Sequence, residues 1–226
     1  MRRANFRTGA LDIAPILIGV VPFGFIAGVT AVEAGLSNLA AILFSPAVFA
    51  GASQLAAYEL IGRDAAVVVI IATVLVINSR FVMYSASLAP HFVGAPAAHK
   101  VAASYLLTDQ AFAASIIRFT RRAEPLELRL AYYFGAALAL WVTWQAATVL
   151  GVIAGAGVPP EWSLDFAIPL VFLALLAPAV TDRATVVAAV VGATTAVVAQ
   201  PLAYNLNIPL AAVAGIVAGL ISEARR

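Results

Sequence analysis

Long apolar runs, each bounded by a few polar residues, follow one another along almost the whole chain. As candidate membrane segments they occupy residues 11–32, 39–61, 65–89, 98–118, 129–154, 164–180, 184–200 and 207–222. One helical crossing of a bilayer needs roughly 20 apolar residues, and these runs do not alternate in polarity as the strands of a membrane barrel do. We therefore expect an all-α, polytopic membrane protein with about eight transmembrane or partly spanning helices. The last three segments are short, so one or two of them could be tilted, re-entrant or incomplete.

Composition supports this fold class and excludes several others. Apolar residues make up 63% of the 226 residues and charged residues 11%, whereas a soluble domain has about 45–50% and about 25%. We therefore expect residues 1–226 to form a single integral membrane domain. The chain has no cysteine, which excludes disulfides, thiolate metal sites and cysteine nucleophiles. The formal net charge is only +2, which favours membrane orientation over nucleic-acid binding as the role of the basic residues.

The distribution of arginines predicts the orientation in the membrane. If all eight segments cross, one side carries the N-terminus, the loops at 62–64, 119–128 and 181–183, and the C-terminus. That side holds Arg2, Arg3, Arg7, Arg63, Arg118, Arg121, Arg122, Arg129, Arg183, Arg225 and Arg226. The opposite side has Lys100 as its only basic residue. Because basic loops remain in the cytoplasm, we expect a plasma or inner membrane protein with both termini cytoplasmic.

Three segments, at residues 21–25, 49–55 and 78–80, interrupt the plain apolar pattern with glycine, proline or polar residues. Irregular backbone at membrane depth is tolerated only where protein buries it or water reaches it. In transporters, such mid-membrane breaks expose helix ends that bind substrate. The candidate substrate-binding residues at these breaks are Phe23, Gly24, Gly51, Ser53, Gln54, Asn78 and Arg80.

Three polar side chains at membrane depth each have a functional and a structural interpretation. Gln54 donates to a substrate carboxylate or a freed carbonyl group, or it only bonds a neighbouring helix. Arg80 costs about 2.5–3.5 kcal/mol to insert, so it either has a functional role or lies near the outer interface and extends its charge into water. Asp109, a further substrate-binding candidate in the middle of segment 98–118, must be protonated or paired. Its candidate partners are Arg80, a substrate ammonium group and a transported proton.

Other features have simpler explanations. Glu59 precedes Arg63 by four residues, which suits an ion pair on one helix face. Glycines four residues apart suit close helix packing, and such pairs occur at Gly24 and Gly28, Gly151 and Gly155, and Gly215 and Gly219. His91 and His99 lack the spacing of a metal site, and no histidine follows His99 to act as a base for Ser53. We therefore expect no enzymatic activity, no metal and no cofactor.

Several of these motifs occur together in one known family. In chain order they are Pro22–Gly24, Ala34–Ser37, Phe49–Gln54, Asn78–Arg80, Tyr84–His91, Leu107–Phe112 and Leu164–Ala167. With them the chain resembles the AzlC-type large subunit of branched-chain amino acid permeases. The resemblance covers nearly the whole chain, is most specific from Phe49 to His91 and is generic in the C-terminal third.

The resemblance implies export of valine, leucine, isoleucine and related compounds, in a two-component system completed by a small AzlD-type membrane subunit. An amino acid zwitterion would bind by its carboxylate to helix N-termini near Gly51–Gln54 and Phe23–Gly24, and by its ammonium group to Asp109 or to exposed carbonyl groups. Phe23, Phe25 and Phe49 would enclose its branched side chain. The family often has glutamate directly after the position of Asp109, whereas this chain has Gln110. This departure removes one carboxylate that could take part in proton coupling.

Two other classes of function stay open at this point. One is a channel or uniporter for another small solute, and the other is a membrane scaffold that transports nothing. Saturable counterflow of labelled amino acids would distinguish an exporter from a channel. A scaffold would tolerate replacement of its polar mid-membrane residues.

Overall fold

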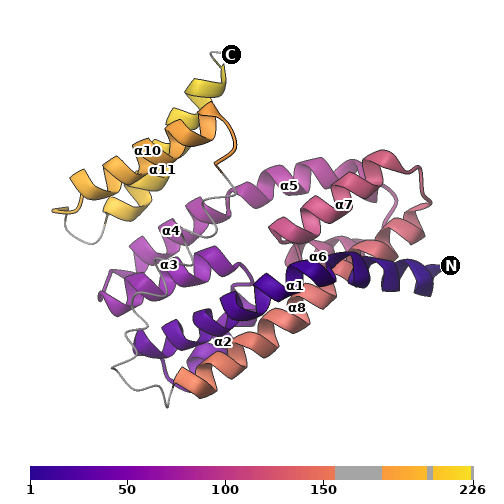
Figure 1. Ribbon diagram of the computed structural model, residues 1–226, viewed down its shortest axis with the longest axis horizontal. Coiled ribbons are helices and arrows are strands. Elements are labelled where there is room, and N and C mark those ends of the chain that lie inside the picture. Colours follow the sequence, from indigo (N-terminus) through magenta and orange to yellow (C-terminus); the bar gives the residue numbers. More distant parts are fainter. Residues whose placement is uncertain (156–179, 203–205, 225–226) are drawn as a thin grey trace.

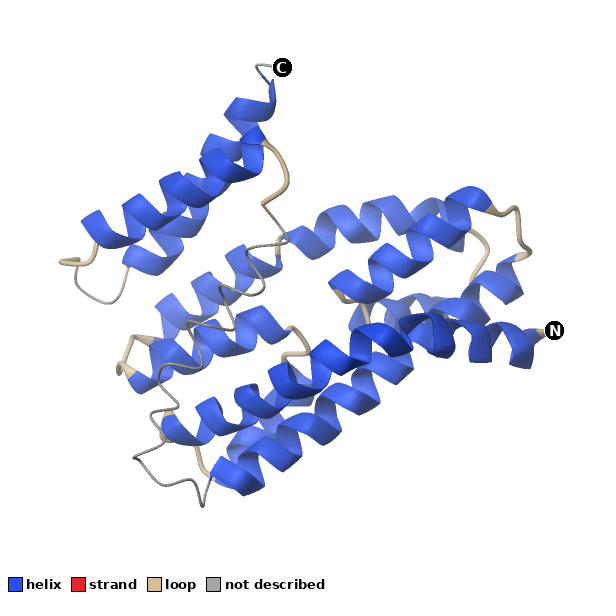
Figure 2. Ribbon diagram, in the orientation of Figure 1, coloured by secondary structure: helices blue, strands red, loops and turns tan. Residues whose placement is uncertain are grey.

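Helices account for all regular secondary structure in the computed structural model, which describes residues 1–155, 180–202 and 206–224 (Figures 1 and 2). In chain order they are α1 (Arg2–Glu33), α2 (Asn38–Ala47), α3 (Gly51–Gly62), α4 (Val67–Asn78), α5 (Arg80–Leu88), the 3₁₀ helix η1 (Ala89–Phe92), α6 (Ala97–Tyr105), α7 (Asp109–Arg121), α8 (Leu126–Gly155), α10 (Arg183–Val198) and α11 (Asn207–Ala224). The predicted all-α fold class is confirmed. The motif Leu164–Ala167 and nearly all of the expected segment 164–180 lie outside the described residues.

Four stretches in the described part are long and apolar enough to cross a membrane: α1, Val67–Phe92, α8 and α11. The first and third of these, α1 and α8, run parallel and form the most extensive helix–helix contact described. Glycines make this contact, because a Cβ on any of four of them would lie 2.0–2.1 Å from a backbone oxygen of the other helix. These are Gly9 and Gly135 near the N-terminal ends of the two helices and Gly28 and Gly151 further along. Close helix packing by glycine was expected, and the structure confirms it.

The expected segment 39–61 forms two short helices, α2 and α3. The chain leaves the C-terminal end of α1 through α2 and returns to that end through α3. The chain turns at Val48–Ala50, where Ala50 is extended with φ −155° and ψ 94°. At the end of α3, a Cβ on Gly62 would lie 3.5 Å from the Cα of Ala34, which directly follows α1. The expected crossing by residues 39–61 is therefore wrong in direction, since the segment is a re-entrant hairpin. The predicted interruption of this segment is present, between Ala47 and Gly51.

A second re-entrant hairpin, α6 and α7, comes from the opposite end of the molecule. Its outgoing arm starts near the first turns of α8, where the rings of His99 and Phe134 lie 6.0 Å apart. Its returning arm ends at the same place, since the Arg118 guanidinium donates to Asn5 Oδ1 at 3.3 Å. The expected crossing by residues 98–118 is therefore also wrong. The break that turns this hairpin back, at Leu106–Thr108, was not among the predicted ones.

The stretch between the hairpins, α4 to η1, does run from one end of the molecule to the other. Its first half packs against α3, and its second half lies beside α7 (Figure 1). The interruption at Ser79 keeps helical dihedral angles, φ −55° and ψ −27°, so the predicted break at residues 78–80 is an offset between two helices rather than an unwound segment.

The predicted break at residues 21–25 is absent, because α1 continues as one helix through Pro15 and Pro22. A proline removes one helical hydrogen bond, and neighbouring helices make such a loss tolerable at membrane depth. Gly24 serves packing here, since its Cβ would lie 3.0 Å from the Cβ of Ala147 in α8. The prediction of a helix N-terminus at Phe23–Gly24 is therefore wrong, and no free helix amides are available there for a substrate carboxylate.

Two further helices form a hairpin of their own beside this core. In α10 and α11, Gly192 lies against Gly215, and Ala188 lies near both Gly215 and Gly219, which makes the pair antiparallel. This hairpin contacts the rest of the molecule where α11 packs on α4.

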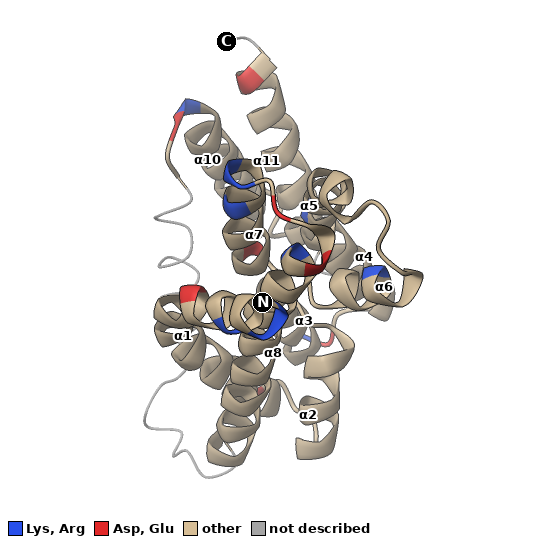
Figure 3. Cartoon of the chain, turned by 90° about the vertical axis from the view of Figure 1, so that its right-hand side faces the viewer, with Lys and Arg blue, Asp and Glu red and all other residues tan. Residues whose placement is uncertain are grey.

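The re-entrant hairpins change which end of the molecule Arg63 and Lys100 lie at. Arg63 moves to the end of the molecule opposite the N-terminus, where it pairs with Glu59 at 2.5 Å as expected for an i, i+4 pair. Lys100, in the first turns of α6, lies at the same end as the N-terminus and not at the opposite end as predicted. The start of α1, the start of α6, the end of α7 and the start of α8 meet at that end, which Figure 3 faces. It therefore holds the basic residues Arg2, Arg3, Arg7, Lys100, Arg118, Arg121, Arg122 and Arg129. The positive-inside rule predicts that this end faces the cytoplasm, and the cytoplasmic location of both termini stays a prediction.

Candidate functional site

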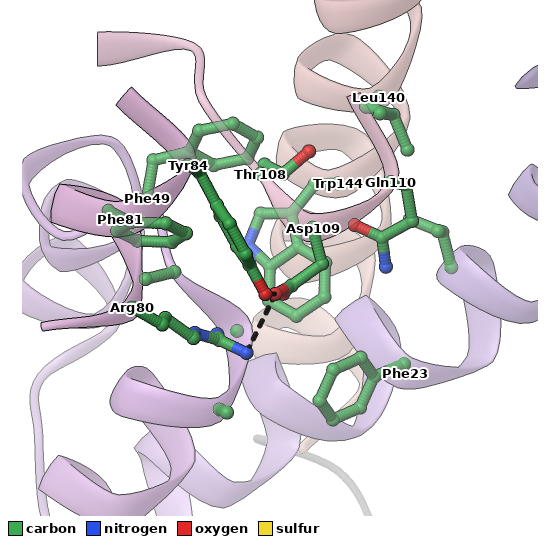
Figure 4. Close-up of a pocket in the computed structure, with 14 residues that line it drawn as sticks. Phe23, Phe49, Arg80, Phe81, Tyr84, Thr108, Asp109, Gln110, Leu140 and Trp144 are labelled. Atoms are coloured by element: carbon green, nitrogen blue, oxygen red, sulfur yellow. Dashed lines mark hydrogen bonds and ion pairs between the residues drawn. The ribbon is translucent and has the colours of Figure 1, made fainter. Parts of the chain in front are cut away.

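The breaks and hairpin tips meet at one cavity of about 560 Å³ in the middle of the molecule (Figure 4). The tip of the first hairpin lines it with Phe49, Ala50, Gly51 and Ala52, and the start of α5 with Arg80, Phe81 and Tyr84. The second hairpin contributes Thr108, Asp109 and Gln110, and the two long parallel helices contribute Val20, Phe23, Leu140 and Trp144. Four of the eight predicted site residues, Phe23, Gly51, Arg80 and Asp109, therefore lie together on one surface.

The N-terminus of α3 opens directly onto this cavity. The first amide groups of a helix have no partner within the helix, and the N-cap residue Ala50 offers no side-chain acceptor for them. Uncapped amides at a helix N-terminus, assisted by the helix dipole, bind anions such as carboxylates. The N-terminus of α7 differs, because the Thr108 hydroxyl accepts a hydrogen bond from the Ala111 amide at 3.2 Å. Of the two hairpin tips, the first is therefore the better anion site.

Arg80 and Asp109 form an ion pair inside the cavity (Figure 4), with 2.9 Å between Nη1 and Oδ1. The same carboxylate oxygen accepts a hydrogen bond from the Tyr84 hydroxyl at 2.8 Å. Of the three candidate partners of Asp109, the structure shows Arg80 paired with it. The pair is open to the cavity, since 31% of the Arg80 side chain and 40% of the Asp109 side chain are exposed. The buried Nε of Arg80 has no hydrogen-bond acceptor among the described residues.

Aromatic rings make up much of the remaining wall. Phe23 and Trp144 pack edge to face with 5.2 Å between ring centroids, and the Arg80 guanidinium lies 5.2 Å from the centre of the Phe81 ring. Tyr84 stacks on Phe112 with centroids 4.3 Å apart. Phe25, which was expected to enclose a substrate side chain, does not line the cavity and is exposed.

The other predicted site residues lie behind the wall. Gln54 is fully buried; its Nε2 donates to the Ser45 carbonyl oxygen, and its Oε1 accepts from Trp144 Nε1, both at 3.1 Å. Gln54 thus reaches a carbonyl group freed by the end of α2, one of its predicted roles. Ser53 is also fully buried and donates to Asn78 Oδ1 at 2.5 Å. These three residues and Gly24 support the cavity without lining it.

Several lining residues were not identified as site residues from the sequence. Tyr84 and Thr108 belong to the quoted family motifs, yet neither received a role. The Thr108-Asp109 pair carries a signal that could have been used, because threonine before an acidic residue is typical of a helix start. Trp144 and Leu140 lie in a plain apolar segment and give no such signal.

The cavity combines three features that are rarely found together at membrane depth. It has amide and guanidinium donors on one side, a carboxylate with a tyrosine hydroxyl on another, and an aromatic wall. Such a site can hold a small molecule that carries an anion, a cation and an apolar group. Among the described residues, no three side chains of His, Asp or Glu gather as a metal site would require.

Residues 15–158 match the family described as AzlC protein. The chain belongs to the AzlC family. It is similar to the inner membrane protein YgaZ of Escherichia coli K12, with 30% identity over 97% of this chain and 89% of the relative. It is also similar to an uncharacterized membrane protein of Archaeoglobus fulgidus, with 31% identity over 80% of this chain and 79% of the relative. No solved structure matches the chain.

Membership in the AzlC family, two membrane relatives and several long apolar helices support a role in membrane transport. The match covers every residue that lines the cavity, from Val20 to Trp144. The site therefore lies in the part of the chain that the family shares.

Proposed function

We propose that this chain is the large subunit of a two-component exporter of branched-chain amino acids and that it moves them without chemical conversion. The observation that carries this proposal is the open Arg80–Asp109 pair beside the uncapped N-terminus of α3. A zwitterion can exchange partners with such a pair, since its carboxylate takes Arg80 and the α3 amides while its ammonium group takes Asp109. The aliphatic side chain then packs against Phe23 and Trp144.

Asp109 also provides a route for coupling to protons. Its carboxylate is paired with Arg80 and open to the cavity, so a transported proton could replace the guanidinium as its partner. With glutamine at position 110, Asp109 is the acidic residue that lines the cavity. A small AzlD-type subunit is part of the proposal because the resemblance to AzlC-type permeases implies a two-component system. Exposed apolar side chains of α4 and α8, such as Ile71, Leu75, Leu150 and Ile153, are compatible with contact to another helix as well as with contact to lipid.

The test is counterflow of labelled leucine in proteoliposomes that contain this chain with and without the small subunit. We expect saturable exchange with leucine, isoleucine and valine when both subunits are present, and no exchange with lysine. The double variant Arg80→Gln, Asp109→Asn at the same protein level is the control for the site. Non-saturable leucine flux would contradict the exporter assignment, and full exchange by this chain alone would contradict the need for a second subunit.

A further inference from the structure

A second cavity, of about 340 Å³, lies on the N-terminal side of the first. It is bounded by α5 and η1, by α6 and by α8. Leu88, Phe92, Leu107 and Tyr133 give it an apolar wall, and Lys100 is the charged residue that lines it. Tyr133 fixes one side, because its hydroxyl donates to the Ala103 carbonyl oxygen at 2.7 Å.

Consecutive residues connect the two cavities. Tyr84 lines the first cavity and Ser85 lines the second, and Thr108 lines the first whereas Leu107 lines the second. The two spaces therefore adjoin each other along α5 and the loop before α7. On the side of the first cavity, the Tyr84 hydroxyl donates to Asp109 at 2.8 Å.

The charge and polarity of its lining suit the second cavity to the same kind of ligand as the first. It has an ammonium group for a carboxylate and apolar walls for an aliphatic side chain. It also lies in the half of the molecule whose outer end carries the cluster of arginines (Figure 3), which attracts anionic groups over several ångströms.

We propose that the second cavity is the vestibule through which the amino acid reaches the Arg80–Asp109 site from the N-terminal side of the membrane. Lys100 binds the substrate carboxylate there first, and displacement of Tyr84 then opens the way between the two cavities. This inference rests on the proposed function, because it takes the same amphipathic zwitterion as the ligand of both cavities.

The absence of native cysteine allows a sharp test with single cysteines. Ser85→Cys places a thiol in the vestibule. Ser87→Cys is the matched control two residues further along α5, because Ser87 lines neither cavity and its hydroxyl donates to the Met83 carbonyl oxygen. Each variant is reconstituted with the small subunit, and an impermeant, anionic methanethiosulfonate is added from one side at a time.

We expect the reagent to modify Ser85→Cys from the N-terminal side only and to lower leucine counterflow at least about tenfold, with leucine slowing the modification. Ser87→Cys should keep its counterflow after the same treatment. Lys100→Gln should raise the apparent KM for leucine supplied from the N-terminal side several-fold, and Lys100→Arg should restore it.

Two results would overturn the vestibule. One is a Ser85→Cys thiol that the reagent does not reach from the N-terminal side. The other is a modified thiol that leaves leucine counterflow unchanged. If the cysteine-free parent itself shows no leucine counterflow, the proposed substrate is wrong, whereas the rate of thiol modification still decides whether a water-filled path exists.

Discussion

Arg80 and Asp109 show how a charged pair at membrane depth can serve binding rather than stability. A fully buried pair is held by its own attraction and is costly to break. This pair is partly exposed to a cavity, so each partner can be replaced by a ligand group of the same sign. The arrangement stabilises both charges in the empty site and leaves them available to a zwitterion.

Removing the charges of Arg80 and Asp109 distinguishes a role of the pair in substrate binding from a purely structural role. A hydrogen bond to a charged group contributes about 1.5–3 kcal/mol, so we expect leucine counterflow to fall about ten- to a hundredfold in Asp109→Asn and in Arg80→Gln. If the pair serves binding, the double variant should be at least as impaired as either single variant. Recovery of counterflow by the double variant at matched membrane levels would instead favour a structural role, and wild-type counterflow by Asp109→Asn would contradict both.

The close packing around Gly51 predicts that even a methyl group at this position would narrow the cavity. A Cβ on this residue would lie 2.7 Å from Trp144 Cη2 and 2.9 Å from Phe23 Cε1. Trp144 cannot easily yield, because its Nε1 is held by Gln54 and Ser45. Crowding of this kind costs about 1–3 kcal/mol, so Gly51→Ala should raise the apparent KM for leucine about fivefold or more.

Gly19→Ala is the control for this substitution, since a Cβ at Gly19 in α1 meets no described atom within 4 Å. Alanine also favours the helix there by about 1 kcal/mol over glycine, and the KM for leucine should not change. Equal effects of the two substitutions would show that Gly51 has no special contact with the wall of the cavity.

At the scale of the helices, apolar length identified the membrane segments but not their direction. Together α2 and α3 have the length and hydropathy of one crossing helix, yet they fold as a hairpin. Long-range contacts decide this, among them Gln54 with Trp144 and Tyr105 with Pro46, and local sequence does not report them. The converse holds at Pro22, where a strong local break signal is overridden by packing against α8.

The same reasoning explains which site residues could be predicted. Arg80, Asp109 and Gly51 are chemically unusual for an apolar helix, so they stand out in the sequence. Trp144 looks like an ordinary membrane aromatic, and Phe23 was chosen as part of a predicted break that the structure does not have. Their role depends on which helix face meets the hairpin tips.

The glycine contact between α1 and α8 predicts a strong effect on folding. A Cβ on Gly151 would lie 2.0 Å from the Phe25 backbone oxygen, and neither backbone can move without separating the helices. Gly151→Ala should therefore lower stability by about 1–3 kcal/mol or more, seen as a lower midpoint of thermal aggregation in detergent. Gly19→Ala in the same helix pair should be at least as stable as the parent, and an unchanged midpoint for Gly151→Ala would contradict the described contact.

At the scale of the whole molecule, the two re-entrant hairpins come from opposite ends and touch at their tips. The Tyr105 hydroxyl at the tip of α6 donates to the Pro46 carbonyl oxygen at 2.9 Å and accepts a hydrogen bond from Trp141 Nε1 at 3.0 Å. Helices broken at mid-membrane around a central site are typical of transporters that open alternately to the two sides. Each hairpin here forms part of the wall towards one side.

This topology can be tested directly against eight full crossings. Single cysteines at Arg3, Arg63 and Val93 lie near the N-terminus, after α3 and after η1. We expect an impermeant maleimide to label Arg3→Cys and Val93→Cys from the same side and Arg63→Cys from the other. Eight crossings predict the reverse pairing, with Arg63→Cys on the side of Arg3→Cys and Val93→Cys opposite.

The bonds that hold the first hairpin tip have a consequence for biosynthesis. Gln54 and Ser45 are bound by Trp144, which follows them by 90 and 99 residues. At about 5–20 residues per second, the ribosome needs roughly 5–20 seconds to supply that tryptophan. During this interval the side-chain amide of Gln54 lacks one of its hydrogen-bond partners. We therefore expect the nascent hairpin to stay in contact with water or with a chaperone until α8 has been made. Chains that stop before α8 are thus expected to be recognised as unfinished and degraded.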